Sequence, residues 1–336
     1  MTVNKFIDLE VYRQNLGAIA KIMAPAQVMA VVKADGYGHG LIETSKAAQE
    51  SGVKILGVLD IETGLKIRKA GVSTALFAWL HSPQSNFQLA VKAGIELSVS
   101  SMAELKAISR VDGIAKIHLK LDTGLSRNGC RIENWSELVS SAMALQRKGS
   151  VSVIALWSHL SGTSLKDDSD SLELFNRGSG LATELGFSGY RHLAASPASF
   201  SLPASRLDMV RIGVSAFGTS PISGVNSAEL GLRNPMKVTT EVHSSGVISI
   251  GFLHGYFSNL AGKAFVSIGG KKYLVLEVGP LASSIEPGDY HPGDEVIVVD
   301  DAPTSEHSAE ALSSLAGTVT DELFTGLKAN LTTYSG

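Results

Sequence analysis

The chain has 336 residues, of which 44% are hydrophobic and 18% charged, enough for one large domain and a smaller one. The formal net charge is −3 and the basic residues are spread along the chain, which argues against a nucleic-acid or membrane partner. The single cysteine, Cys130, excludes a disulfide framework or a cysteine-based metal site, and we expect no metal. Without a signal-like N-terminus or an apolar run long enough to span a membrane, we expect a cytoplasmic protein.

The first two-thirds of the chain alternates short apolar runs with amphipathic helical patterns. The runs are rich in Val, Ile and Leu, as strands buried on both faces should be. We predict strands at 28–33, 55–58, 75–78, 96–99, 116–121, 153–157, 191–194 and 209–212. Helical patterns lie between them, for example at 41–51, 61–70, 101–109 and 134–148. Such alternation of strands and helices predicts an α/β fold, a (β/α)8 TIM-type barrel.

The pattern changes after about residue 221. Residues 238–299 are β-rich, with turn signals at Gly269-Gly270, Pro287-Gly288 and Pro292-Gly293, and short helices are expected at 308–316 and 321–327. We therefore predict a barrel domain at 1–225 and a smaller, mainly β C-terminal domain at 226–336. Residues 1–9 could join either part.

A lysine stands at the end of the first predicted strand. Residues 31–40 read VVKADGYGHG, which places Lys33 before a glycine-rich loop. In a barrel the carboxyl ends of the strands face the active site, and a lysine there can react with a carbonyl compound. The alternative is a strand-end lysine that simply reaches solvent, which is the commoner case for a lysine taken at random.

Three later segments have the same strand-then-polar-loop character. Residues 118–129 read HLKLDTGLSRNG, and the planar guanidinium of Arg127 suits a carboxylate, although Arg127 could instead form a loop ion pair with Asp122. His159 follows the strand at 153–157, where a structural histidine is the alternative. Residues 194–197 (AASP) and 209–214 (MVRIGV) would end the last two strands, where backbone amides commonly bind phosphate.

These segments closely resemble the motifs of the alanine racemases, enzymes that use pyridoxal 5'-phosphate (PLP) on a (β/α)8 barrel with a C-terminal β domain. The similarity extends over most of the chain. It implies that Lys33 holds PLP as a Schiff base and acts as a base on one face of the substrate. The residues that it implies for cofactor binding are Lys33, Tyr37, His159, Ser196, Arg211, Gly213 and Val214.

The resemblance also implies roles for three cationic residues. Arg127 would contact the cofactor's phenolic oxygen and the substrate carboxylate, which makes it catalytic beside Lys33. Lys120 matches a lysine that is often carbamylated and then orients this arginine. Arg211 would bond the pyridine nitrogen and keep it neutral, so that the carbanion is less delocalised and racemisation is favoured over transamination.

The second half of the implied site departs from the family. The family takes its second proton group from a tyrosine of the partner subunit, on a loop before a Gly-Tyr-Ala-Asp-Gly-Tyr motif; here residues 251–256 read GFLHGY. We expect no room between residues 235 and 251 for the preceding strand and the tyrosine loop. Ala195 replaces a family asparagine, EVGPL at 277–281 lacks a Met-Asp pair, and LKAN at 327–330 stands where the family has another tyrosine.

His254 and Tyr256 are the candidate replacements for the missing second base, because they lie near the shortened loop in sequence. The alternative is that Tyr256 is a structural aromatic residue and His254 a surface residue.

Three functions are compatible with these residues. The first is a PLP-dependent amino-acid racemase, converting L-alanine to D-alanine for cell-wall precursors, as a homodimer with its site at the subunit interface. The second is a PLP-binding homologue without racemase activity, either a cofactor carrier or an enzyme of a different PLP reaction. The third, from the residues alone, is a phosphate-binding barrel without PLP. A chiral assay for D-alanine with added PLP separates them.

Overall fold

A computed structural model of the chain describes residues 2–82, 84–244, 246–302 and 305–336. The chain forms two compact units that interleave along the sequence. The barrel unit contains Ile19–Lys33 and Ala48–Gly213, and the β unit contains Met1–Ala18, Ala34–Ala47 and Val214–Gly336. The predicted domains, 1–225 and 226–336, divide the chain at one point, whereas the two units interleave along the sequence. That division therefore stays a prediction.

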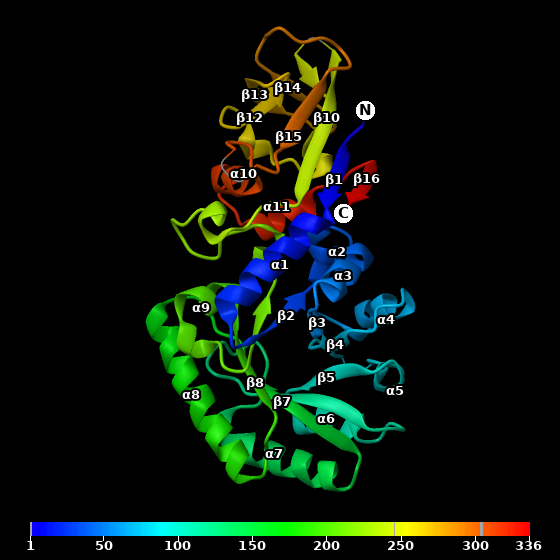
Figure 1. Ribbon diagram of the computed structural model, residues 1–336, viewed down its shortest axis with the longest axis vertical. Coiled ribbons are helices and arrows are strands. Elements are labelled where there is room, and N and C mark those ends of the chain that lie inside the picture. The colour runs from blue at the N-terminus through cyan, green and yellow to red at the C-terminus, as the bar shows by residue number, and fades with distance from the viewer. Residues whose placement is uncertain (1, 83, 245, 303–304) are drawn as a thin grey trace. The chain divides into compact units, whose positions relative to one another are not determined.

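The barrel unit is built on eight parallel strands that close into a barrel, which confirms the predicted TIM-type fold (Figure 1). Each strand pairs with the next one along the chain, and β2 pairs with β9 to close the ring. The strands are β2 (Gln27–Val31), β3 (Ile55–Val58), β4 (Ala75–Ala78), β5 (Ile95–Val99), β6 (Ala115–Lys120), β7 (Val151–Trp157), β8 (Tyr190–Ala195) and β9 (Met209–Ile212). All eight lie within two residues of their predicted bounds.

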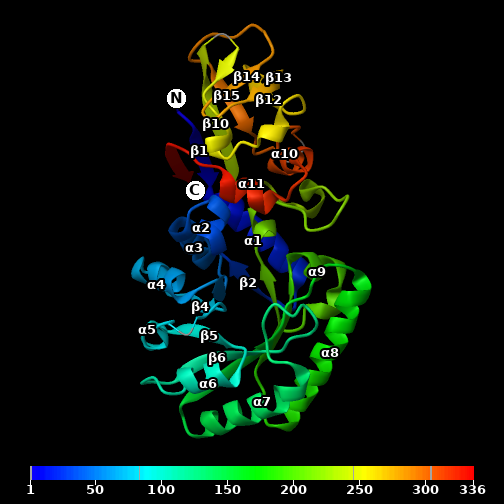
Figure 2. The ribbon, with the colours of Figure 1, turned by 180° about the vertical axis from the view of Figure 1, so that it is seen from behind.

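Helices follow the strands and cover the outside of the barrel (Figures 1 and 2). They are α4 (Ile61–Lys69), α5 (Phe87–Lys92), α6 (Met102–Ile108), α7 (Ile132–Arg147), α8 (Leu165–Glu184) and α9 (Ser196–Ser201). Local side-chain caps begin several of them: Asp60 accepts from the Thr63 N–H, and Ser101 accepts from the Glu104 N–H. Inside the barrel, a buried cluster of Met29, Ile55, Phe77, Trp157 and Met209 fills the core.

The β unit contains one eight-stranded sheet with the order β11-β14-β13-β12-β15-β10-β1-β16. The strands are β1 (Asn4–Asp8), β10 (Met236–Ser244), β11 (Val247–Ile248), β12 (Phe265–Ile268), β13 (Lys271–Val278), β14 (Ser283–Ile285), β15 (Glu295–Val299) and β16 (Leu331–Ser335). The N-terminal strand β1 therefore belongs to this sheet, antiparallel to β10 and parallel to β16. This confirms a C-terminal, mainly β part to which the first residues are added.

The remaining helices are α1 (Leu9–Met23), α2 (Lys33–Gly38), α3 (Leu41–Glu50), α10 (Ala309–Ala316) and α11 (Thr320–Gly326). The first three contain residues of both units, because the chain passes between the units along them. No helix in the described residues has the length and apolar character needed to cross a membrane.

One expectation about the segment between residues 235 and 251 is wrong. The segment holds two strands, β10 and β11, which pair as a hairpin with Val242 opposite Ile248 and Ser244 opposite Val247. A strand therefore does fit in this segment, contrary to that part of the expectation. The segment contains no tyrosine.

Candidate active site

The predicted site residues of the barrel unit lie at or after the carboxyl ends of its strands, with Lys120 and Arg211 still inside β6 and β9. Lys33 lies two residues after β2, Arg127 is in the loop after β6, and His159 follows β7. Ser196 directly follows β8, and Gly213 directly follows β9. Because all eight strands are parallel, these residues share the end of the barrel that carries active sites in this fold.

Lys33 is half-buried and begins α2, so the predicted strand ends earlier than residue 33. After it the chain turns left-handed: Ala34, Asp35, Gly36 and Tyr37 have φ between 51° and 59°. A run of such values is costly for residues with a Cβ. The glycine-rich loop was predicted, but its left-handed turn was not.

Arg211 is a buried cation on β9, 4% exposed. Nη1 donates to His192 Nδ1 (3.1 Å) and to the His192 carbonyl (3.2 Å). Nη2 donates to the Ser158 carbonyl (2.9 Å), the Leu193 carbonyl (2.9 Å) and His159 Nδ1 (3.0 Å). The described residues thus engage both Nη groups and give the Nε hydrogen no acceptor, which leaves one directed donor for a ligand.

His159 is neutral because Arg211 donates to its Nδ1 and because its surroundings are cationic. Burial, followed by the charges of Arg211, Arg127, Lys120 and Lys33, lowers the pKa of His159 to about 3. Arg211 is hydrogen-bonded to the ring, and Arg127, Lys120 and Lys33 influence its pKa through their charges. The barrel unit thus brings Lys33, Arg127, His159 and Arg211 together, as the resemblance implies.

Lys120 is buried at the end of β6, with Nζ 4.2 Å from the Trp157 ring centroid and hydrogen-bonded to Asn128 Oδ1. Burial and then the charges of Arg211 and Arg127 lower the pKa of Lys120 to about 7. A substantial fraction of this amine is therefore neutral near pH 7, which is the reactive form of an amine.

Ser196 and Gly213 form a small polar pair between the ends of β8 and β9. The Gly213 N–H donates to Ser196 Oγ over 3.2 Å, and Ser196 is buried. Because Oγ accepts this hydrogen bond, its own hydrogen is free to point toward an acceptor.

Tyr37 and Val214 belong to the β unit and are joined there. The buried Tyr37 hydroxyl is hydrogen-bonded to the Val214 backbone, while its ring packs beside Phe217 at a centroid distance of 5.3 Å. Burial raises the pKa of Tyr37, so its hydroxyl stays protonated at physiological pH.

The two candidate replacement bases differ in exposure. Tyr256 is fully buried, its hydroxyl has no partner among the described residues, and burial raises its pKa. His254 is half-buried in a short 3-10 turn, and its Nδ1 accepts from the Gly251 N–H over 3.2 Å. Burial lowers the pKa of His254. Its bound Nδ1 leaves Nε2 to carry the proton of the neutral ring.

Sequence reasoning missed three buried polar residues that lie behind Arg211. Glu96 on β5, His118 on β6 and His192 on β8 are each less than 6% exposed. Glu96 Oε2 lies 2.8 Å from His118 Nε2, and His118 Nδ1 lies 2.9 Å from His192 Nε2. The available signal was a polar or charged residue in the middle of a strand expected to be buried on both faces, although these strands also carry polar residues such as Ser98 and Lys116.

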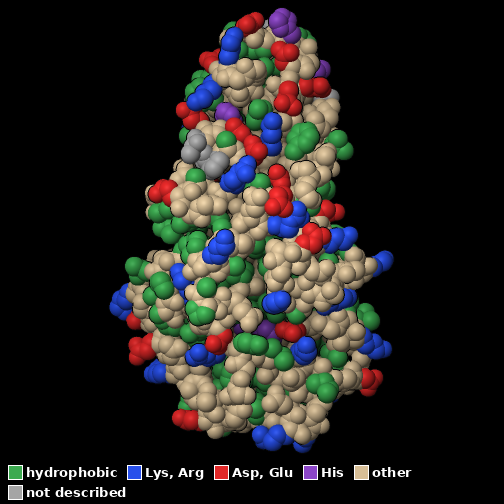
Figure 3. Space-filling view, viewed as in Figure 1, with side chains coloured by type: hydrophobic (Ala, Val, Ile, Leu, Met, Phe, Trp, Pro, Cys, Tyr) green, Lys and Arg blue, Asp and Glu red, His purple; other side chains and the backbone are tan. Residues whose placement is uncertain are grey.

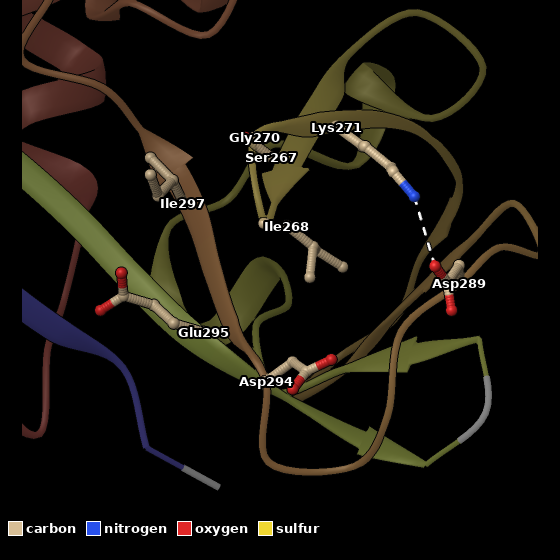
Figure 4. Close-up of a pocket in the computed structure, with 9 residues that line it drawn as sticks. Ser267, Ile268, Gly270, Lys271, Asp289, Asp294, Glu295 and Ile297 are labelled. Carbon is tan, nitrogen blue, oxygen red and sulfur yellow. Dashed lines mark hydrogen bonds and ion pairs between the residues drawn. The ribbon is translucent and has the colours of Figure 1, made fainter.

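A surface cavity of about 580 Å³ lies in the β unit, away from all of these residues (Figure 4). It is lined by Ser267, Ile268, Gly269, Gly270, Lys271, Asp289, Asp294, Glu295 and Ile297. Lys271 Nζ pairs with Asp289 Oδ2 at 3.3 Å across it. Neither this cavity nor any other part of the described chain groups three metal-ligating side chains. Charges of both signs are mixed over the face seen in Figure 3.

The parallel barrel, with a lysine and two arginines around a neutral histidine at the carboxyl ends of its strands, defines the class: a (β/α)8 barrel with a polar site at its mouth and an added β unit. Residues 7–221 match the family of the alanine racemase N-terminal domain. The chain belongs to the alanine racemase family.

Curated relatives and solved structures agree with this assignment. The alanine racemase of Salinispora tropica is 38% identical over 244 residues, which cover 70% of this chain and 64% of that protein. The alanine racemase of Frankia casuarinae is 30% identical over 97% of this chain and 94% of its own length. The crystal structure of alanine racemase from the D-cycloserine producer Streptomyces lavendulae superposes with a TM-score of 0.94 at 30% identity, covering 100% of this chain and 97% of that one.

The alanine racemase of Bartonella henselae, whose structure has covalently bound pyridoxal phosphate, shares the fold with a TM-score of 0.86 at 20% identity. That alignment covers 99% of each chain.

Proposed function

We propose that this protein is a PLP-dependent amino-acid racemase that interconverts L-alanine and D-alanine. The observation that carries the proposal is the neutral His159 at the barrel mouth, hydrogen-bonded to the buried Arg211 and influenced by the charges of Arg127, Lys120 and Lys33. Family membership favours this activity over a PLP-binding homologue without racemase activity.

The donor set of the barrel unit fits PLP in its chemistry. Lys33 supplies an amine for the cofactor aldehyde, and the flat, neutral ring of His159 suits stacking on the pyridine. Arg211 has its Nε hydrogen left for the pyridine nitrogen, and the Ser196 hydroxyl hydrogen suits the phosphate, with Gly213 beside it donating its N–H to Ser196 Oγ.

The β unit carries two further candidates for phosphate binding, Tyr37 and Val214. The Tyr37 hydroxyl oxygen accepts from the Val214 backbone, which leaves the hydroxyl hydrogen as a neutral donor. Neutral donors suit an anionic phosphate because they bind it without the cost of burying another charge.

When bound, PLP withdraws electrons from the substrate α-carbon and so acidifies its proton. Lys33 removes or returns that proton on one face, and Arg127 binds the substrate carboxylate with two parallel hydrogen bonds. Arg211 can only donate, so at the pyridine nitrogen it would favour the unprotonated form, which favours return of the proton to the α-carbon. Burial and the charge of Arg127 lower the pKa of Arg211 to about 9, so it remains a cation at neutral pH.

For the second face of the substrate we propose His254, with Tyr256 as the alternative. His254 is the less buried of the two and carries its proton on Nε2, whereas the Tyr256 hydroxyl is enclosed. For Lys120 we propose carbamylation, because its pKa of about 7 leaves a neutral amine to react with carbon dioxide. A homodimer with the site at the subunit interface and a cytoplasmic location are parts of the same proposal.

The test is a chiral assay for D-alanine formed from L-alanine with added PLP, run on the natural chain and on Lys33→Ala. Covalent attachment is measured separately, by borohydride reduction followed by the mass of the peptide that contains residue 33. We expect D-alanine and a PLP adduct on Lys33 in the natural chain, and neither in Lys33→Ala. An adduct on another lysine would contradict the assignment of Lys33, and an adduct without D-alanine would favour the homologue without racemase activity.

A further inference from the structure

Arg211 is a buried cation without a carboxylate among its hydrogen-bond partners in the described chain. Its acceptors are three backbone carbonyls and two imidazole nitrogens. A buried charge is costly unless an opposite charge or a set of well-oriented dipoles compensates it. The compensating groups must therefore be sought beyond the direct partners of Arg211.

The buried residues behind Arg211 form a continuous chain of hydrogen bonds that ends at a carboxylate. Arg211 Nη1 lies 3.1 Å from His192 Nδ1, and His192 Nε2 lies 2.9 Å from His118 Nδ1. His118 Nε2 lies 2.8 Å from Glu96 Oε2. Four barrel strands, β5, β6, β8 and β9, each contribute one residue.

Arg211 determines which ring nitrogen carries the proton in each imidazole of this series of hydrogen bonds. A guanidinium only donates, so His192 Nδ1 must accept, and the proton of a neutral His192 is on Nε2. His192 Nε2–H then donates to His118 Nδ1, and the remaining proton of His118, on Nε2, donates to Glu96. Burial and the charge of Arg211 lower the pKa of His192 far below its usual value, which agrees with a neutral ring.

Aromatic side chains hold both imidazoles in place. Phe77 stacks on His118 with centroids 4.1 Å apart and planes 15° apart. Trp157 stacks on His192 with planes 12° apart, and Trp157 Nε1–H donates to Ser98 Oγ over 3.1 Å. A ring flip would exchange a nitrogen for a carbon at each end, and this packing opposes it.

We infer that Glu96, His118 and His192 are positioning residues for Arg211, acting as a one-way hydrogen-bond chain that orients its guanidinium and compensates its charge from a distance. The importance of this orientation for the reaction rests on the proposed function. The carboxylate is separated from Arg211 by two neutral rings, so it stabilises the cation without occupying a guanidinium N–H. The Nε hydrogen of Arg211 is therefore left for the pyridine nitrogen.

The direct test is the tautomer of each imidazole in the holoenzyme, measured by long-range 15N–1H correlation in protein labelled with 15N-histidine. His118→Gln and His192→Gln identify the two signals by their loss. At neutral pH we expect both rings to be neutral with the proton on Nε2. A cationic ring, or a proton on Nδ1 of either ring, would overturn the inference, and this measurement needs no substitution at Glu96.

Two substitutions at Glu96 separate the hydrogen bond from the charge. Glu96→Gln keeps an oxygen acceptor, so both tautomers should be retained. Glu96→Leu removes the acceptor of the His118 Nε2–H, so the signal of this N–H should shift, while Arg211 still holds the proton of His192 on Nε2. PLP affinity or kcat should fall about 10–100-fold in Glu96→Leu, as is typical for loss of a supporting partner, with the KM for alanine changed much less. An unshifted His118 Nε2–H signal together with unchanged PLP affinity and kcat in a folded Glu96→Leu protein would contradict the inference.

Lys116→Gln is the matched control. Lys116 Nζ lies 3.7 Å from Glu96 Oε1 but is 57% exposed and makes no bond to the imidazoles. In Lys116→Gln we expect the tautomers of His118 and His192, the PLP affinity and kcat to equal those of the natural chain. If the tautomers are as expected but no PLP binds, the proposed function fails while the hydrogen-bond chain stands.

Discussion

Lys120 combines a buried position with a cationic neighbourhood, and both effects favour its neutral amine. Burial comes first among the causes, followed by the charges of Arg211 and Arg127, and together they bring the pKa to about 7. The cationic neighbours also favour a carbamate, because an anionic group there would lie among cations.

We predict that Lys120 takes up carbon dioxide as a carbamate. In protein equilibrated with 13C-bicarbonate, a carbamate carbonyl signal should be present at about pH 8. It should weaken toward about pH 6, because the amine is protonated below its pKa of about 7. The measurement is 13C NMR, with Lys120→Arg as the control that keeps a cation but cannot react. An equal signal in Lys120→Arg would refute the assignment.

His39 is a buried histidine outside the proposed chemistry. Its ring lies between Phe217 and Phe324, Nδ1 donates to the Tyr37 carbonyl over 2.9 Å, and Nε2 has no partner among the described residues. Burial, as the largest cause, lowers the pKa of His39 to about 3. The folded protein therefore holds this ring neutral, whereas the unfolded chain protonates it near pH 6.5.

The difference between the folded and unfolded pKa of His39 predicts that the free energy of unfolding falls at acid pH. Because the folded pKa lies below the unfolded one, the unfolded state binds the proton first. The free energy of unfolding should then fall by about 1.4 kcal/mol per pH unit from His39 alone, between about pH 6.5 and pH 3. Above that range the contribution is fully present.

Urea unfolding at a series of pH values measures it, with His39→Asn as the comparison, since Asn keeps a donor near Nδ1 but does not titrate. The other buried histidines titrate in both proteins, so the difference in slope belongs to His39. Equal slopes in the two proteins would show that His39 is protonated in the folded state.

At the scale of elements, the left-handed turn of α2 constrains which residues its positions can carry. Gly36 has φ +59°, and a Cβ at this position would lie 2.4 Å from Thr44 Oγ1. Thr44 Oγ1 itself donates to the Gly40 carbonyl over 2.6 Å, so it is not free to move away. Glycine is needed at residue 36 both for conformation and for space.

We predict that Gly36→Ala lowers the free energy of unfolding by more than about 2 kcal/mol. About 1–2 kcal/mol comes from the left-handed backbone conformation, and the rest comes from the collision with Thr44. Gly52→Ala is the matched control, because Gly52 also has positive φ (+85°) but no atom within 4 Å of a Cβ. It should cost only about 1 kcal/mol. Equal losses in the two variants, measured by urea unfolding, would mean that Thr44 adapts.

At the scale of the whole molecule, the reaction is expected to be unequal on its two faces. Lys33 serves one face, while the hairpin β10–β11 holds no tyrosine for the other. Loss of one positioned acid or base typically costs about 10²–10⁴ in rate. His254 or solvent must then deliver the second proton.

We predict that exchange of the α-proton of L-alanine with D2O outruns inversion. Lys33 removes and returns a proton on its own face, so the configuration is retained while deuterium enters. Proton NMR in D2O gives the exchange rate and a chiral assay gives the inversion rate. Inversion that keeps pace with exchange would establish a full second base, and His254→Ala and Tyr256→Phe would then identify it.

The assembly is the second whole-molecule prediction. We expect a homodimer in which the β unit of each chain covers the partner's barrel mouth, because an open mouth leaves the reacting carbon exposed to water. Light scattering at micromolar concentration should give twice the chain mass of 35.3 kDa. A strictly monomeric mass would count against both the dimer and the racemase.

The barrel strands and the site residues could be predicted from the sequence to different extents. The eight barrel strands were predicted within two residues, since fully buried parallel strands are uninterrupted apolar runs that end at turn residues. Lys33, Arg127, His159 and Arg211 could be proposed as site residues because each lies at or after the end of such a run, in a motif that resembles one family. These are local signals, carried by residues that are neighbours in the chain.

Only the tertiary structure could add the rest. Glu96, His118 and His192 lie on three different strands, up to 96 positions apart in the sequence, and no local pattern shows that closure of the barrel joins them into one chain. The placement of β1 beside β10 and β16, and the burial of Tyr256, likewise depend on contacts between distant segments. Local sequence determined which elements form and which residues end them. Packing across the barrel decided the burial, the charge state and the proton positions around Arg211, because these properties depend on what surrounds each group in space.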